Sequence, residues 1–281
     1  MNRRIIIFLL LAAAAASCTE KINLKLDSTY TRLVVDGHIT SDSMAHTVVL
    51  TKTSDYFSNQ PAPKVVNATL TLSDGTNSFP MMETVPGQSG KYATDPSFAG
   101  VIGKTYTLNI SLPEVMAGTS EYTASSELKG VTRLDSIKAV FRTDIGKDGI
   151  WQVKVFAQDP PGTRNYYMMN LYRNGILWSD TITKVTITDN QFFAGNYIPG
   201  ADAFYINNTN KWQTLYPGDT IMLELSAITK EYYDFIGQVQ YAGYSIPFFT
   251  GPPANVAGNI SNNGVGFFAA YSSSFATCIV K

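Results

Sequence analysis

Residues 67–73 read NATLTLS, and their apolar side chains stand at every second position. Successive side chains of an extended chain point to opposite faces, so the alanine and the leucines share one face while the threonines share the other. This alternation is typical of a strand that packs one face on a core and exposes the other to water. Asp74 and Gly75 follow directly and predict the turn that ends the strand.

Segments of the same kind occur along most of the chain, separated by turns rich in Gly, Asn, Asp and Pro. Asn174 and Gly175 separate two such segments and predict a two-residue type I′ hairpin turn. The predicted strands are 32–40, 46–53, 67–73 and 104–112 in a first set, then 136–142, 151–158, 166–173, 181–188, 219–227 and 266–271 in a second, and a separate last strand through Cys278 is left open.

This spacing predicts an all-β fold, mainly β with one short helix, built as two β-sandwich-like domains. The N-terminal sandwich is expected at 29–125 and a mostly β C-terminal domain at 133–281, with a linker around 125–132. The helix is expected near 229–243, because Thr229 is a suitable N-cap and the apolar residues that follow it recur at helical spacing.

The start of the chain has the composition of a secretory signal peptide. Two arginines precede an unbroken apolar run over 5–16, which is shorter than the roughly 20 residues of a membrane-spanning helix. Cys18 follows small residues, as in the lipobox of bacterial lipoproteins. We therefore predict a signal peptide at 1–17, lipidation of Cys18 and a tether at 18–28. The alternative is a secreted protein in which Cys18 is an ordinary residue.

Lipidation would make the membrane a partner of the mature chain. Cys278 is the only other cysteine, so a lipidated Cys18 leaves it without a disulfide partner, and we interpret Cys278 as a small thiol within a terminal strand. Loss of the signal peptide removes two of the 21 basic residues and leaves 19 against 22 acidic ones, a net charge of −3. This balance disfavours nucleic acid or an anionic lipid surface as a partner.

Known catalytic motifs are absent from the sequence: it contains no phosphate-cradling glycine loop, HExxH, CxxC or GxSxG. We predict no catalytic residues, no metal and no cofactor. The only histidines, His38 and His46, are interpreted as surface residues and not as a metal site. Residues 144–149 (DIGKDG) lack the full ligand pattern of a calcium loop and predict a hairpin turn. Carboxylates that meet only in space, as in glycoside hydrolases, remain an open alternative.

Residues 190–216 are rich in aromatic side chains, interleaved with amides and glycines. Rings with hydrogen-bonding tips suit the recognition of sugars, peptides or another protein. The favoured competing interpretation is that these rings fill the core between β-sheets. The candidate contacts to a ligand or partner are Phe193, Tyr197, Tyr205, Trp212 and Tyr216.

The C-terminal part of the chain resembles a known family. Residues 246–272 read IPFFTGPPANVAGNISNNGVGFFAAYS, which closely resembles the C-terminal motif of domain-of-unknown-function family 4249. LVVDGHIT at 33–40, VVNATLTLSDG at 65–75, GKTYTLNI at 103–110 and DPPGTRNYY at 159–167 are similar to it as well. The prolines and glycines of 246–272 independently predict a structured loop, which serves either as a belt over the second sandwich or as a docking surface.

The resemblance implies an envelope lipoprotein of Bacteroidota with an immunoglobulin-like or transthyretin-like N-terminal sandwich. It also implies an outer-membrane location, often near TonB-dependent nutrient transporters, and it supplies no catalytic residues because the family has no established activity. We expect a non-catalytic binding or accessory lipoprotein whose ligand is a small molecule, glycan or peptide. The alternatives are a structural or adhesive, fimbrillin-like surface subunit and, ranked last, a hydrolase. The periplasmic and surface faces of the membrane both remain open.

Overall fold

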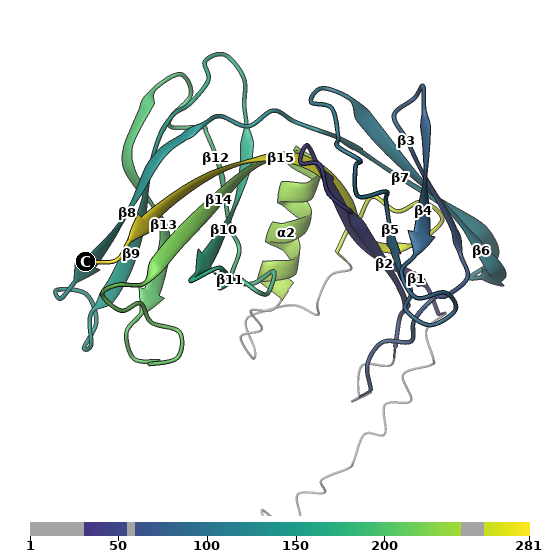
Figure 1. Cartoon of the computed structure of the whole chain (residues 1–281), viewed down its shortest axis with the longest axis horizontal. Helices are drawn as coiled ribbons and strands as arrows, with labels where there is room; N and C mark the ends of the chain where they lie inside the picture. The colour runs from purple at the N-terminus through teal and green to yellow at the C-terminus, as the bar shows by residue number, and fades with distance from the viewer. Residues whose placement is uncertain (1–30, 55–59, 243–255) are drawn as a thin grey trace, which may run out of the picture. The chain divides into compact units, whose positions relative to one another are not determined.

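The computed structural model (Figure 1) describes residues 31–54, 60–242 and 256–281. Cys18 lies outside the described residues, together with the predicted signal peptide at 1–17, the predicted tether at 18–28 and the 246–255 part of the predicted C-terminal loop. The described residues form fifteen strands and one helix. This confirms the prediction of a mostly β fold with one helix, in sheets consistent with a β-sandwich.

Seven strands form the N-terminal half. In β3 both leucines are buried and Thr69 is exposed, as the NATLTLS alternation predicts. The structure adds β4, β5 and β7 to the strands expected from the sequence. The seven are β1 (Leu33–Thr40), β2 (Thr47–Lys52), β3 (Thr69–Ser73), β4 (Ser78–Glu83), β5 (Lys91–Ala93), β6 (Thr105–Met116) and β7 (Thr119–Glu127).

The C-terminal half holds the other strands and the helix. The strand expected at 181–188 is wrong in its first part, because Lys184 N–H donates to Thr181 O (2.9 Å) and closes a turn there. The elements are β8 (Leu134–Arg142), β9 (Ile150–Gln158), β10 (Tyr166–Arg173), β11 (Ile176–Leu177), β12 (Thr186–Asp189), β13 (Tyr197–Asn207), β14 (Thr220–Ile228), α2 (Lys230–Ala242) and β15 (Val265–Ile279).

Two local predictions are confirmed. Asn174 and Gly175 join β10 to β11 with φ values of +51° and +80°, the left-handed conformations that a type I′ turn requires at both central positions. Helix α2 begins after Thr229, whose Oγ1 accepts the Tyr232 N–H at 3.3 Å and so caps the first turn. Within the described residues no helix has the length and apolar character needed to cross a membrane.

The strands form two sheets. A three-stranded sheet has the order β13-β9-β8. The large sheet has the order β11-β10-β14-β15-β1-β2-β5-β4-β3-β6-β7, with β12 also paired to β10. In the N-terminal half the sheet curls until its last strand, β7, again contacts β15, where Ala270 N–H donates to Ser126 Oγ at 2.9 Å.

Strand β15 belongs to both halves (Figure 1). Its first part, 265–271, pairs parallel with β1, and its second part, 272–279, pairs antiparallel with β14. Phe268 of the first part lies in the N-terminal core, while Cys278 of the second part packs on the core between β14 and the three-stranded sheet. The predicted boundaries at 125 and 133 stay a prediction, and the structure adds that the halves share this strand.

The parallel pairing of β15 with β1 depends on a glycine. Gly266 has φ of +93°, and a Cβ placed there would lie only 2.0 Å from the carbonyl oxygen of Val35. Any side chain therefore strains its own backbone and also pushes the two strands apart. Gly218 has nearly the same φ, +95°, but no atom lies within 4 Å of its would-be Cβ.

We predict that Gly266→Ala lowers the free energy of unfolding by about 3 kcal/mol or more, because backbone strain and overpacking both act. Gly218→Ala meets only the strain and is expected to cost about 1 to 2 kcal/mol. Urea denaturation of the two variants beside the wild type makes the comparison. Equal losses would show that the contact with Val35 does not constrain β15.

Candidate ligand cavity

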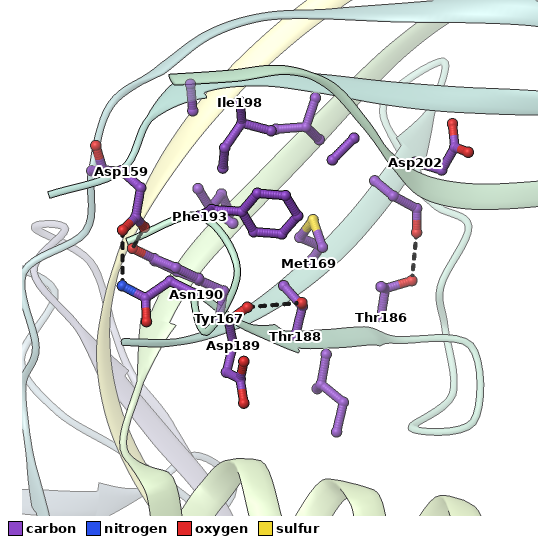
Figure 2. Close-up of a pocket in the computed structure, with 17 residues that line it drawn as sticks. Asp159, Tyr167, Met169, Thr186, Thr188, Asp189, Asn190, Phe193, Ile198 and Asp202 are labelled. Atoms are coloured by element: carbon purple, nitrogen blue, oxygen red, sulfur yellow. Dashed lines mark hydrogen bonds between the residues drawn. The ribbon is translucent and has the colours of Figure 1, made fainter. Parts of the chain in front are cut away.

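A cavity of about 340 Å³ lies between the two sheets of the C-terminal half (Figure 2). Its walls come from β9 and β13 of the three-stranded sheet and from β10, β12 and β14 of the large sheet. Ordinary cores contain few voids larger than a water molecule, whereas small-molecule sites measure roughly 300 to 1,000 Å³. The cavity therefore has the size of a site for a small ligand.

Most of the cavity wall is apolar. Phe193 reaches into the cavity from the turn between β12 and β13 (Figure 2). Two backbone hydrogen bonds fix this turn, from Phe193 N–H to Asn190 O (2.9 Å) and from Asn196 N–H to Phe193 O (2.7 Å). The other apolar lining residues are Val155, Ala157, Met169, Ile187, Ile198, Ala201, Ala203 and Leu225.

One end of the cavity carries a buried polar cluster of Asp159, Tyr167 and Asn190, hereafter the polar end. The Asp159 side chain has no solvent exposure. Its Oδ1 accepts the Tyr167 hydroxyl at 2.8 Å and its Oδ2 accepts an Asn190 Nδ2–H at 2.8 Å. Burial, followed by the hydrogen bond to Asp159, raises the pKa of Tyr167 well above its usual value, so this hydroxyl remains a donor at neutral pH.

The polar end also fixes a neighbouring connection between strands. Asn190 donates a second hydrogen bond to Thr163 O (2.9 Å) and accepts the Asn165 N–H at 2.9 Å, which holds the connection between β9 and β10 in place. Asp159 Oδ1 accepts one side-chain hydrogen bond, from Tyr167, and Oδ2 accepts one, from Asn190, although a carboxylate oxygen has two acceptor positions. The ion pairs among the described residues do not include Asp159. The fully buried Asp159 carboxylate thus keeps acceptor positions that Tyr167 and Asn190 do not use.

Strand β12 forms the rim of the cavity and is fixed at two points. Thr186 Oγ1 donates to Ala203 O at 2.8 Å, which ties β12 to β13 in the other sheet (Figure 2). Arg164 Nη2 donates to Asp189 Oδ2 at 2.6 Å, and this bond lowers the pKa of the Asp189 carboxyl. Both contacts hold the rim against the cavity walls.

The structure does not bring the five predicted contact residues together at the cavity. Only Phe193 lines the cavity. Tyr197 and Tyr205 lie on β13 with exposed side chains, and Trp212 and Tyr216 lie in the connection between β13 and β14, also exposed. The interpretation of the 190–216 rings as core filling is therefore wrong for these four, because their side chains face solvent. Their role as ligand or partner contacts stays a prediction.

The structure places the two histidines in different surroundings. The interpretation of both as surface residues is wrong for His46, which is 2% exposed: its Nδ1 accepts the Thr40 N–H (3.2 Å) and its Nε2 lies 3.1 Å from Asp42 O. Burial lowers the pKa of His46. His38 stacks on Tyr271 with ring centroids 5.3 Å apart. Among the described residues no group of three His, Cys, Asp or Glu side chains is placed to hold a metal.

Sequence reasoning missed the polar end. Asp159 opens the DPPGTRNYY run and Tyr167 closes it, but Asn190 joins them from beyond the next two strands. The prolines and the glycine of this run are typical of a turn, but nothing in the run predicts that Asn190 would hydrogen-bond to it. The hairpin expected at 144–149 is confirmed, since this segment joins the antiparallel strands β8 and β9.

We predict that Tyr167→Phe lowers the free energy of unfolding by about 1 to 3 kcal/mol, because a buried carboxylate oxygen loses its donor. Tyr205→Phe is the matched control: its hydroxyl also donates to an aspartate, Asp202 (2.8 Å), but the side chain is 59% exposed and water can replace it. A change below about 0.5 kcal/mol is expected there. If thermal or urea unfolding shows that the two variants lose equal free energy of unfolding, the buried Asp159 carboxylate does not need the Tyr167 hydroxyl as its donor.

Comparison with known proteins places the chain in a family. No match was found among curated proteins. A family model matches residues 19–275, a range that contains both halves of the fold and the whole cavity wall. The chain belongs to the family described as Domain of unknown function (DUF4249).

Proposed function

We propose that this chain is a lipid-anchored, non-catalytic binding component of the outer membrane that works beside a TonB-dependent nutrient transporter. The single observation that carries the proposal is the cavity of about 340 Å³ between the sheets. An apolar wall with one small group of convergent polar atoms is the usual composition of a site that holds a small molecule. The polar end supplies the atoms that would orient such a molecule.

The chemical composition of the cavity wall limits the kind of ligand that fits. The apolar side chains favour an apolar body, and Asp159 at the polar end favours a head group that donates hydrogen bonds. Bound there, the head would occupy acceptor positions of a carboxylate that is fully buried. The rim formed by β12 and the Phe193 turn borders the space through which the ligand would contact solvent.

The anchor is proposed from the sequence. Cys18 follows an apolar run and small residues, and several acyl chains, each contributing about 0.8 kcal/mol per buried methylene, would hold the mature chain at a membrane. The predicted tether at 18–28 would leave the binding domain outside the bilayer. A position beside a transporter would let the binding domain pass its ligand on.

Four chains test this proposal when each is purified both from the soluble fraction and from detergent-solubilised membranes. The wild type is expected to co-purify with a TonB-dependent transporter and to release a small molecule on denaturation, detected by mass spectrometry. Cys18→Ala is expected in the soluble fraction without the transporter. Ala201→Phe, which fills the cavity from its half-buried wall, is expected to keep the transporter and lose the small molecule, and Ala194→Phe, exposed and outside the cavity, keeps both.

A wild-type chain that carries neither transporter nor small molecule contradicts the proposal. The same preparation tests the alternative of a structural or adhesive subunit, which requires removal of an N-terminal segment and strand exchange between copies. A monomer that begins at lipidated Cys18 excludes that alternative.

A further inference from the structure

Trp212 is 91% exposed and lies in the connection between β13 and β14, which we call the Trp212 loop (208–219). An indole gains little from water and much from burial, so a tryptophan is rarely left this open. The side chain lines a shallow, open hollow of about 660 Å³ on the surface of this loop, separate from the cavity between the sheets. No residue of the hollow also lines the cavity.

The Trp212 loop is held in one conformation by its own polar groups. Asn207 Oδ1 accepts both the N–H of Thr209 (2.8 Å) and its hydroxyl (2.6 Å). Asn210 Oδ1 accepts the N–H of Trp212 at 3.1 Å, which fixes the backbone from which the indole projects. The ring is therefore presented by an ordered backbone, and little conformational entropy is lost when it binds.

The base of the Trp212 loop is held by contacts within the loop and with residues of β10 and of the segment after β11. Trp178 Nε1 donates to Gln213 O at 2.9 Å, and the Tyr216 hydroxyl donates to Lys211 O at 2.9 Å. Arg173 lies over the Tyr216 ring, 5.4 Å from its centroid. None of these contacts covers the indole face of Trp212, which stays open to solvent.

The polar atoms around the indole are available to a ligand. The side chains of Lys211 and Gln213, and the Nδ2 groups of Asn207 and Asn210, donate no hydrogen bond to another described residue. They line the same hollow as Trp212, together with Thr209. The hollow thus combines one flat apolar face with a ring of amide donors and acceptors and a single charge.

The residues that line the hollow suit a carbohydrate better than a protein or a nucleic acid. A protein partner buries about 800 Å² on each side with an apolar centre, but the neighbours of Trp212 in the hollow are all polar. A nucleic acid would require clustered positive charge, and the hollow holds one lysine in an acidic chain. A pyranose ring has an apolar face edged by hydroxyl groups, and this face matches an indole surrounded by amides.

We propose that the Trp212 loop is a carbohydrate-binding site, in which the indole of Trp212 stacks on a pyranose ring and the amides of Asn207, Asn210 and Gln213 bond its hydroxyls. The site is independent of the cavity and does not rest on the function proposed above. Neutral oligosaccharides are the expected ligand class, because one charged side chain lines the hollow.

The test applies the purified protein, kept in detergent, to an array of immobilised neutral glucans, xylans, mannans and chitin fragments. Titration calorimetry with the oligosaccharide that binds then follows. Trp212→Ala is expected to weaken binding at least tenfold, and Gln213→Ala about threefold. Trp212→Phe, which keeps a smaller ring, is expected to fall between Trp212→Ala and the wild type. Phe192→Ala removes another exposed ring (82% exposed) outside the hollow and is expected to bind as the wild type does.

A second readout reports on the indole itself. Trp151 is buried and Trp178 is partly buried, so quenching by acrylamide is dominated by Trp212. Bound oligosaccharide is expected to protect the fluorescence of the wild type and to leave that of Trp212→Phe unchanged. Absence of binding to any glycan overturns the proposal, and so does binding that Trp212→Ala, folded as judged by its melting temperature, retains in full.

Discussion

The structure depends on the pairing of β15 with β1 and β14 at once. A strand normally serves one domain, but the two parts of β15 extend two different edges of sheet, parallel on one side and antiparallel on the other. Gly266 permits the parallel part, because its backbone approaches Val35 too closely for a side chain. The last strand of the chain therefore completes the first core as well as the second.

The position of the cavity also depends on β15, because both of the sheets that form its walls contact this strand. Strands β10 and β14, which form one wall, reach the rest of the large sheet only through β15. The opposite sheet is tied to the same strand, since β8 contacts β15 and Leu134 N–H donates to Ser274 Oγ at 2.9 Å. One strand thus sets the separation of the two walls, and the polar end closes the space where β9 leaves the sheet.

The sequence predicted what local patterns determine. The NATLTLS alternation, the Asn174-Gly175 turn and the Thr229 cap each act over a few residues, and the structure has all three. Long-range pairings carry no such signal: nothing local in 265–279 shows that this strand pairs with β1. The burial of Asp159 was missed for the same reason, because it depends on which segments lie nearby in space and not on its own neighbours in sequence.

We infer that β15 joins both halves into one cooperative unit. Hydrogen exchange measured against urea concentration tests it, by following amides of β3 in the N-terminal half and of β10 in the C-terminal half. As the urea concentration rises, the two sets of amides are expected to converge on one opening free energy, because neither core is complete without the shared strand. Two separate opening free energies, with β10 exchanging while β3 stays protected, would contradict it.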